Sequence, residues 1–133
     1  MVLYKADVNG KVVIPSKANV DIIRKGEVDP NAVNILFAAN SHIVMFGDDA
    51  FQNFTKLTTI IIPSSVISIG SHAFQNCTNL GKGKPFKLPR TVEIIGLGAF
   101  SGCFTRPSKT KINNNINGII AKNPVKETVL LLH

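Results

Sequence analysis

A tandem repeat between residues 43 and 103 constrains the fold of this chain more than any other feature. Three successive segments, 43–65, 66–91 and 92–103, share a glycine, an Ala-Phe pair and a small or apolar residue three positions later. The aligned columns are Gly47, Gly70 and Gly96; Ala50, Ala73 and Ala99; Phe51, Phe74 and Phe100; and Phe54, Cys77 and Cys103. The glycines are 23 and then 26 residues apart, so the second interval carries three extra residues, within 81–86. Periods of roughly 20–50 residues are typical of solenoids, in which each repeat buries its apolar side chains against the next.

A weaker copy of the pattern precedes the clear repeats. Residues 12–15 resemble 60–63, and residues 20–23 resemble 66–69. Residues 35–40 fill the intervening position and end at the corner where the other copies have proline. The predicted corners are Pro15, Asn40, Pro63 and Pro89. They lie 25, 23 and 26 residues apart, which predicts about three to four turns.

The alternation of apolar and polar residues predicts which side chains face the core, because successive side chains of a strand point to opposite faces. The predicted inward pairs are Ile60 and Ile62, Phe86 and Leu88, and Phe37 and Ala39. The predicted outward residues are Thr59, Ile61, Lys87 and Ala38. Proline ends each strand because it lacks the N–H that a ladder needs. Gly70 marks either a positive φ or a close approach between turns, and Phe74 opens a short helical turn that fills the interior.

The string I-x-I-P-x-x-V-x-x-I-G-x-x-A-F-x-x-C-x-x-L, which spans residues 60–80, resembles the BspA-type leucine-rich repeat. The resemblance covers residues 43–103 clearly and 12–42 loosely. It implies a mainly β fold, a short right-handed solenoid of parallel strands and short helical turns. The family is known mostly for cell-surface adhesion and host interaction, so the resemblance implies a protein-interaction module.

The pattern predicts one domain over residues 1–133. Residues 1–11 form an N-terminal cap, in which Asn9-Gly10 makes a turn between 3–8 and 11–14; residues 12–103 form the repeats. Residues 104–133 form a divergent basic cap or tail, with apolar strands at 119–120 and 128–132. Caps are needed because an open solenoid end exposes core and strand edges.

Charge is distributed unevenly along the chain. The net charge is +7; residues 1–80 hold six basic and six acidic side chains, whereas residues 81–133 hold nine basic and two acidic ones. A one-sided basic surface attracts anionic partners, which include nucleic acid, an acidic protein face and a membrane headgroup layer; the same charges also suit a solvated face. The predicted partner-binding residues are Lys82, Lys84, Lys87, Arg90, Arg106, Lys109 and Lys111, with the outward Thr59 and Ile61.

No pattern in the sequence predicts catalysis, a cofactor or a metal site. The histidines have no metal-ligand spacing, and no phosphate-loop or nucleophile motif occurs. Cys77 and Cys103 share a core column, so we predict buried, reduced thiols. The sequons at Asn53 and Asn76 are also equivalent repeat positions, and we expect neither to be glycosylated. Asp48 and Asp49 are interpreted as favourable charges at a turn.

Two functions remain open on these grounds. The first is a non-enzymatic protein-interaction or structural module that presents a sheet face and a basic surface. The second is a small basic component of a large assembly, such as a virion or a ribonucleoprotein particle. No segment has the apolar length of a membrane span, and the N-terminus lacks the apolar run of a secretory signal. The sequence therefore predicts an intracellular protein, or a cell-surface one if the chain is a fragment of a longer protein.

Overall fold

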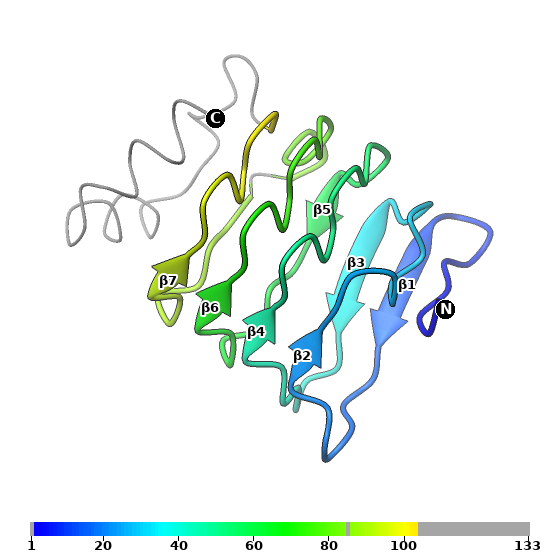
Figure 1. Cartoon of the computed structure of the whole chain (residues 1–133). Coiled ribbons are helices and arrows are strands. Elements are labelled where there is room, and N and C mark those ends of the chain that lie inside the picture. Colours follow the sequence, from blue (N-terminus) through cyan, green and yellow to red (C-terminus); the bar gives the residue numbers. More distant parts are fainter. Residues whose placement is uncertain (1, 85, 104–133) are drawn as a thin grey trace.

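The chain winds as a solenoid of about four turns, with seven short strands in two parallel sheets (Figure 1). This computed structural model describes residues 2–84 and 86–103. The strands are β1 (Lys11–Ile14), β2 (Ile22–Ile23), β3 (Asn34–Phe37), β4 (Met45–Phe46), β5 (Thr59–Ile60), β6 (Ser68–Ile69) and β7 (Ile94–Ile95). The expected parallel-strand solenoid is confirmed.

Each turn contributes to both sheets in order. The first sheet runs β1-β3-β5 and the second runs β2-β4-β6-β7. In the first sheet Val12 pairs with Ile35, which pairs with Ile60. In the second, Phe46 pairs with Ile69. These paired side chains are all buried, so the core is the space between the two sheets.

The register corrects one predicted corner. Ile35, rather than Phe37, pairs with Ile60, so Ala38 occupies the corner that we assigned to Asn40. The Ala38 N–H donates to the Ile14 carbonyl at 2.9 Å, and Ala39, predicted inward, is exposed. The corner after β3 (residues 38–44) is two residues longer than the corner that precedes β6 (residues 63–67). The sequence alignment missed this difference. It matched Asn40 with the prolines of the other corners, and so placed the two additional residues inside the strand rather than in the corner.

A column of stacked phenylalanines fills the interior. The rings of Phe51 and Phe74 have centroids 5.0 Å apart, and those of Phe74 and Phe100 are 5.4 Å apart and nearly parallel. Phe46 meets both Phe51 and Phe74 edge-on. Offset stacking and edge-on contacts are the favoured aromatic geometries. The predicted inward phenylalanine column is therefore present, with Phe51, Phe74 and Phe100 almost fully buried.

The loops that follow the second sheet repeat the same backbone conformation. The expected short helical turns are isolated turns here: the Phe54 N–H donates to the Phe51 carbonyl at 3.2 Å, and the described residues contain no helix. Gly70 serves a close approach, since a Cβ there would lie 2.6 Å from the Asp48 backbone nitrogen. The positive φ values fall elsewhere in the loops, at equivalent positions of successive turns: Asp49, His72 and Gly98, and then Asn53, Asn76 and Gly102.

The N-terminal segment closes the first turn. The Gly10 N–H donates to the Asp7 carbonyl at 3.0 Å with Gly10 at φ 81, which confirms the Asn9-Gly10 turn. Tyr4 is buried and pairs with Val28 in a parallel bridge. The start of the chain therefore pairs with the loop after β2. The predicted cap or tail over 104–133 lies outside the described residues.

Candidate functional site

The three-residue insertion breaks the repeat beside β5. Up to that point the turns stay in frame: the Thr58 N–H donates to the Val33 carbonyl, and the Gly81 N–H donates to the Thr58 carbonyl, each at 2.9 Å. Within the described residues, the first sheet ends at β5, whereas the second sheet continues to β7. The segment after Gly81 therefore runs alongside β5 without joining the sheet as a strand.

A cleft of about 500 Å³ lies between β5 and this segment. Its floor consists of apolar side chains that are buried in the core: Ile60, Ile62, Leu80, Phe86 and Leu88. Its rim carries Thr59, Ile61, Lys84 and Lys87, among other residues, and none of the described residues that line it is a carboxylate. An apolar floor with cations at the rim suits a ligand that is partly apolar and partly anionic.

The structure brings four of the predicted binding residues to this cleft, namely Thr59, Ile61, Lys84 and Lys87. Lys82 and Arg90 are exposed but do not line it. No ion pair joins any of the four cations of residues 82–90 to a carboxylate in the described part of the chain. The predicted residues Arg106, Lys109 and Lys111 lie outside the described residues.

An apolar row crosses the outer face of the first sheet and reaches the cleft. Val13 pairs with Leu36 in the ladder, and Ile61 follows in the next turn. Val13 is 55% exposed and Ile61 52% exposed. Side chains of this kind beside a cleft are typical of contact surfaces. Ile61, predicted to point outward, does so.

Sequence reasoning had treated the cleft floor only as core. Phe86 and Leu88 were correctly predicted to point inward, and Leu80 was recognised only as part of the repeat motif. The signal that separates this part of the core from the rest is the insertion itself, because added residues in one turn displace the chain from its neighbour. The position of the insertion could be read from the sequence, but its effect on strand pairing depends on the backbone geometry.

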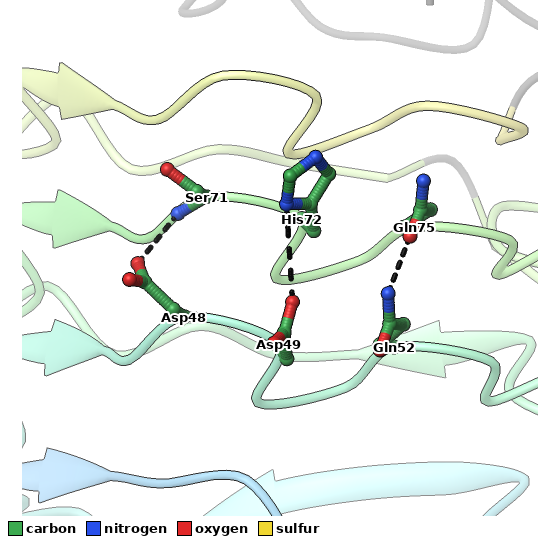
Figure 2. Close-up of polar contacts among 6 residues, drawn as sticks. All are labelled: Asp48, Asp49, Gln52, Ser71, His72 and Gln75. Carbon is green, nitrogen blue, oxygen red and sulfur yellow. Dashed lines mark hydrogen bonds and ion pairs between the residues drawn. The ribbon is translucent and has the colours of Figure 1, made fainter.

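A second group of polar residues joins successive turns without forming a reactive site (Figure 2). The Ser71 N–H donates to Asp48 Oδ1 at 2.8 Å, and the Gln52 amide donates to the Gln75 side-chain oxygen. His72 Nδ1 lies 3.9 Å from Asp49 Oδ1, and both side chains are partly exposed. Among residues 2–84 and 86–103 no cluster of three metal-ligating side chains occurs. These contacts stack one loop on the next.

The two cysteines are free and buried. Cys77 Sγ donates to the Phe51 carbonyl at 3.1 Å, and Cys103 Sγ donates to the Phe74 carbonyl at 2.8 Å. The neighbouring Cys103 thiol, together with burial, raises the pKa of Cys77 well above its usual range. A thiol in this environment is a poor nucleophile.

The sequon asparagines have a backbone role. Asn53 and Asn76 adopt φ values of 65 and 62, a region that asparagine tolerates better than most residues. The Asn76 amide also donates to Asn53 Oδ1 at 3.0 Å. Gly102 takes the equivalent place in the last described turn with φ 78. Turn geometry thus accounts for the asparagine column.

The described residues include no helix with the length and apolar character needed to cross a membrane.

Parallel strands stacked in turns of about two dozen residues, with an inward aliphatic and phenylalanine core, define a leucine-rich repeat solenoid. The sequence profile described as "BspA type Leucine rich repeat region (6 copies)" matches residues 34–122, more than half of the chain. The chain belongs to the BspA-type leucine-rich repeat family. The match extends past residue 103, where the motif had ceased to be recognisable by inspection.

Among solved structures, the crystal structure of the T. pallidum leucine-rich repeat protein TpLRR is similar, at 19% sequence identity and a TM-score of 0.46. The similarity covers 74% of this chain and 63% of that one. No curated protein matches the sequence. Leucine-rich repeat domains serve as protein-interaction or structural modules and are generally not enzymes.

Proposed function

We propose that this domain is a protein-interaction module that binds an acidic segment of a partner at the cleft beside β5. The observation that carries the proposal is the meeting of Lys84, Lys87 and the outward Ile61 around one apolar-floored cleft whose described lining contains no carboxylate. The exposed Lys82 and Arg90 flank it in sequence and extend the positive field.

The electrostatics favour an anionic ligand. Lys84 and Lys87 have no ion-pair partner among the described residues. Charge complementarity speeds encounter and selects among partners. Their field is screened over roughly 8–10 Å at physiological ionic strength. The exposed Ile61 side chain at the rim offers apolar area whose burial by a ligand adds affinity that salt does not weaken.

A double charge reversal tests the proposal. Lys84→Glu/Lys87→Glu should weaken binding of an acidic synthetic peptide by at least about tenfold, because two attractive contacts become repulsive. The matched control is Lys25→Glu/Lys56→Glu, which changes the net charge equally at exposed lysines away from the cleft. Binding is measured by fluorescence anisotropy at low and at physiological salt, and the melting temperature is measured for both variants.

Equal weakening by both double variants would contradict the proposal, since the effect would then come from net charge alone. A single-stranded RNA oligonucleotide of matched charge is the second probe. Tighter binding of the RNA than of the acidic peptide would favour the alternative, a basic component of a ribonucleoprotein or viral assembly. Arg106, Lys109 and Lys111, outside the described residues, are proposed to contribute to binding of the same partner, and their charge reversal should add to the effect. Intracellular residence likewise remains a prediction.

A further inference from the structure

A small hollow adjoins the cleft on the other side of Ile61. It has a volume of about 190 Å³ and lies between the corners of two successive turns, at residues 38–41 and 63–65. The corner after β3 is two residues longer than the corner before β6, so the two corners cannot stack residue on residue. Ile61 lines both the hollow and the cleft. The residues that line the hollow are Phe37, Ala38, Ala39, Ser41, Ile61, Pro63, Ser64 and Ser65.

The apolar side chains of the hollow are accessible to a ligand. Phe37 is half-buried, whereas every other phenylalanine within residues 2–84 and 86–103 is buried. The Phe37 ring packs against Phe46, with centroids 5.8 Å apart. Ile61 is 52% exposed, and Ala39 is exposed as well. An apolar side chain of a ligand can therefore cover apolar surface here that the domain itself leaves in contact with water, and such burial is favourable.

Two serine side chains of the hollow are already hydrogen-bonded within the domain. Ser65 Oγ donates to the Ile43 carbonyl at 2.6 Å, and the Ile43 N–H donates to Ser41 Oγ at 3.2 Å. Among the described residues, no charged side chain lines the hollow. A polar ligand group would lose its water here and find few partners, which is costly. The hollow therefore fits an uncharged, apolar side chain.

We propose that the acidic segment of the partner carries one apolar side chain, which occupies this hollow while a nearby carboxylate of the segment meets Lys87. This inference rests on the proposed function and adds a second specificity element to it. Lys84 and Lys87 have no ion-pair partner in the described part of the chain. Because Ile61 separates the hollow from the lysines, a segment that covers Ile61 reaches both.

The spacing of the turns predicts the spacing of the two ligand side chains. The hollow lies between the turn of Ile61 and the preceding turn, whereas Lys87 belongs to the following turn. Neighbouring strands lie about 4.8 Å apart, so one and a half spacings correspond to about 7 Å. In an extended peptide, residues i and i+2 point to the same side and are also about 7 Å apart. The predicted motif is therefore an apolar residue two positions from an acidic one, on a segment that crosses the turns.

Three capped peptides of equal charge test this motif against the whole chain. They are Glu-Gly-Leu-Gly-Glu, Glu-Gly-Ala-Gly-Glu and Glu-Leu-Gly-Gly-Glu, and the first presents the predicted spacing in either chain direction. The first peptide should bind about tenfold more tightly than the other two, because it alone buries a leucine in the hollow while a glutamate meets Lys87. Titrations followed by NMR give the dissociation constants. The amide resonances of Ala39 and Ser64 should shift most with the first peptide.

A variant of the hollow locates the leucine. Ala39→Gln places a larger, polar side chain at the hollow and should remove the advantage of the leucine peptide over the alanine peptide. The matched control is Ala18→Gln, because Ala18 is an exposed alanine after β1 that does not line the hollow. The melting temperature of each variant shows whether the fold is kept.

Equal affinities of the first two peptides, or a leucine advantage that survives Ala39→Gln, overturn this inference. If Lys84→Glu/Lys87→Glu still weakens binding of both peptides in that case, the proposed function stands. If the double reversal leaves both affinities unchanged, the proposed function fails as well. A natural chain that sediments as a dimer, and as a monomer after Ala39→Gln, would also overturn the inference, because a second copy would then occupy the hollow.

Discussion

The phenylalanine column is the residue-scale feature on which the fold depends most. Phe74 lies between Phe51 and Phe100, contacts Phe46 edge-on and has no exposed surface. Each turn has a single layer of inward side chains, so a ring in the middle of the stack supports the turns on both sides.

Phe74→Ala should lower the free energy of unfolding by about 3–5 kcal/mol, the usual cost of a buried phenylalanine truncation. The control is Leu97→Ala, because Leu97 is 60% exposed and its loss should cost within about 0.5 kcal/mol. Urea unfolding followed by circular dichroism measures both. A Phe74→Ala protein that melts within a few degrees of the parent would show that the inward face is assigned wrongly.

The inward-facing residues of the strands were predictable from the sequence because side chains along a strand alternate between its two faces. The inward assignment of Ile60 and Ile62 followed from that period, and both are buried. The assignment of Ala39 failed because the corners differ in length, and no residue type marks the two added positions. Conserved spacing between aligned repeats is thus informative for strands, whereas corners tolerate insertion.

At the scale of elements, the N-terminal segment is held to the first turn by a carboxylate. Asp29 Oδ2 accepts the Ala6 N–H at 3.0 Å, and its Oδ1 accepts the Asn31 N–H at 3.0 Å. These backbone hydrogen bonds, that of Ala6 foremost, hold the pKa of Asp29 below its usual value. Because the pKa is lower in the folded state, the charged carboxylate stabilises that state above the unfolded pKa of about 3.9.

This stabilisation should be lost as the pH falls through the folded-state pKa of Asp29. We expect the Ala6 amide to lose protection from hydrogen exchange at a pH below the usual titration range of aspartate, while the core remains protected. Asp29→Asn keeps an acceptor oxygen but does not titrate. In this variant the protection of the Ala6 amide from hydrogen exchange should be weaker and nearly independent of pH. An Ala6 amide that is equally protected at acid and neutral pH in the natural chain would contradict this.

At the scale of elements, only part of the candidate site could be predicted from the sequence. The lysines near the insertion were identified because residues 81–133 hold the whole charge excess. The open edge of β5 was not identified, because three added residues can either loop out above an intact ladder or separate two turns. The choice depends on backbone paths that no local residue pattern encodes.

At the scale of the whole molecule, the solenoid combines a continuous second sheet with a first sheet that stops one turn earlier in the described chain. The continuous sheet and the phenylalanine column hold the turns together, so the first sheet can open without loss of the stack. A repeat domain whose turns are nearly equivalent thereby acquires one unique surface.

The central claim is that the three-residue insertion leaves the outer edge of β5 without a paired strand in the described chain. Deletion of residues 82–84 shortens the spacing from Gly70 to Gly96 from 26 to the 23 residues of the preceding turn, and it should let residues 86–88 pair with β5. The length control is Lys82→Gln/Lys84→Gln, which removes the charges and keeps the loop.

The most direct measurement is the hydrogen-exchange rate of the Ile60 amide relative to that of Ile61 in these three proteins. We predict that Ile60 exchanges much faster than Ile61 in the natural chain and in the length control, because only Ile61 donates to a carbonyl of β3. In the deletion variant Ile60 should become as slow as Ile61. An Ile60 amide that is already as slow as Ile61 in the natural chain would contradict the account.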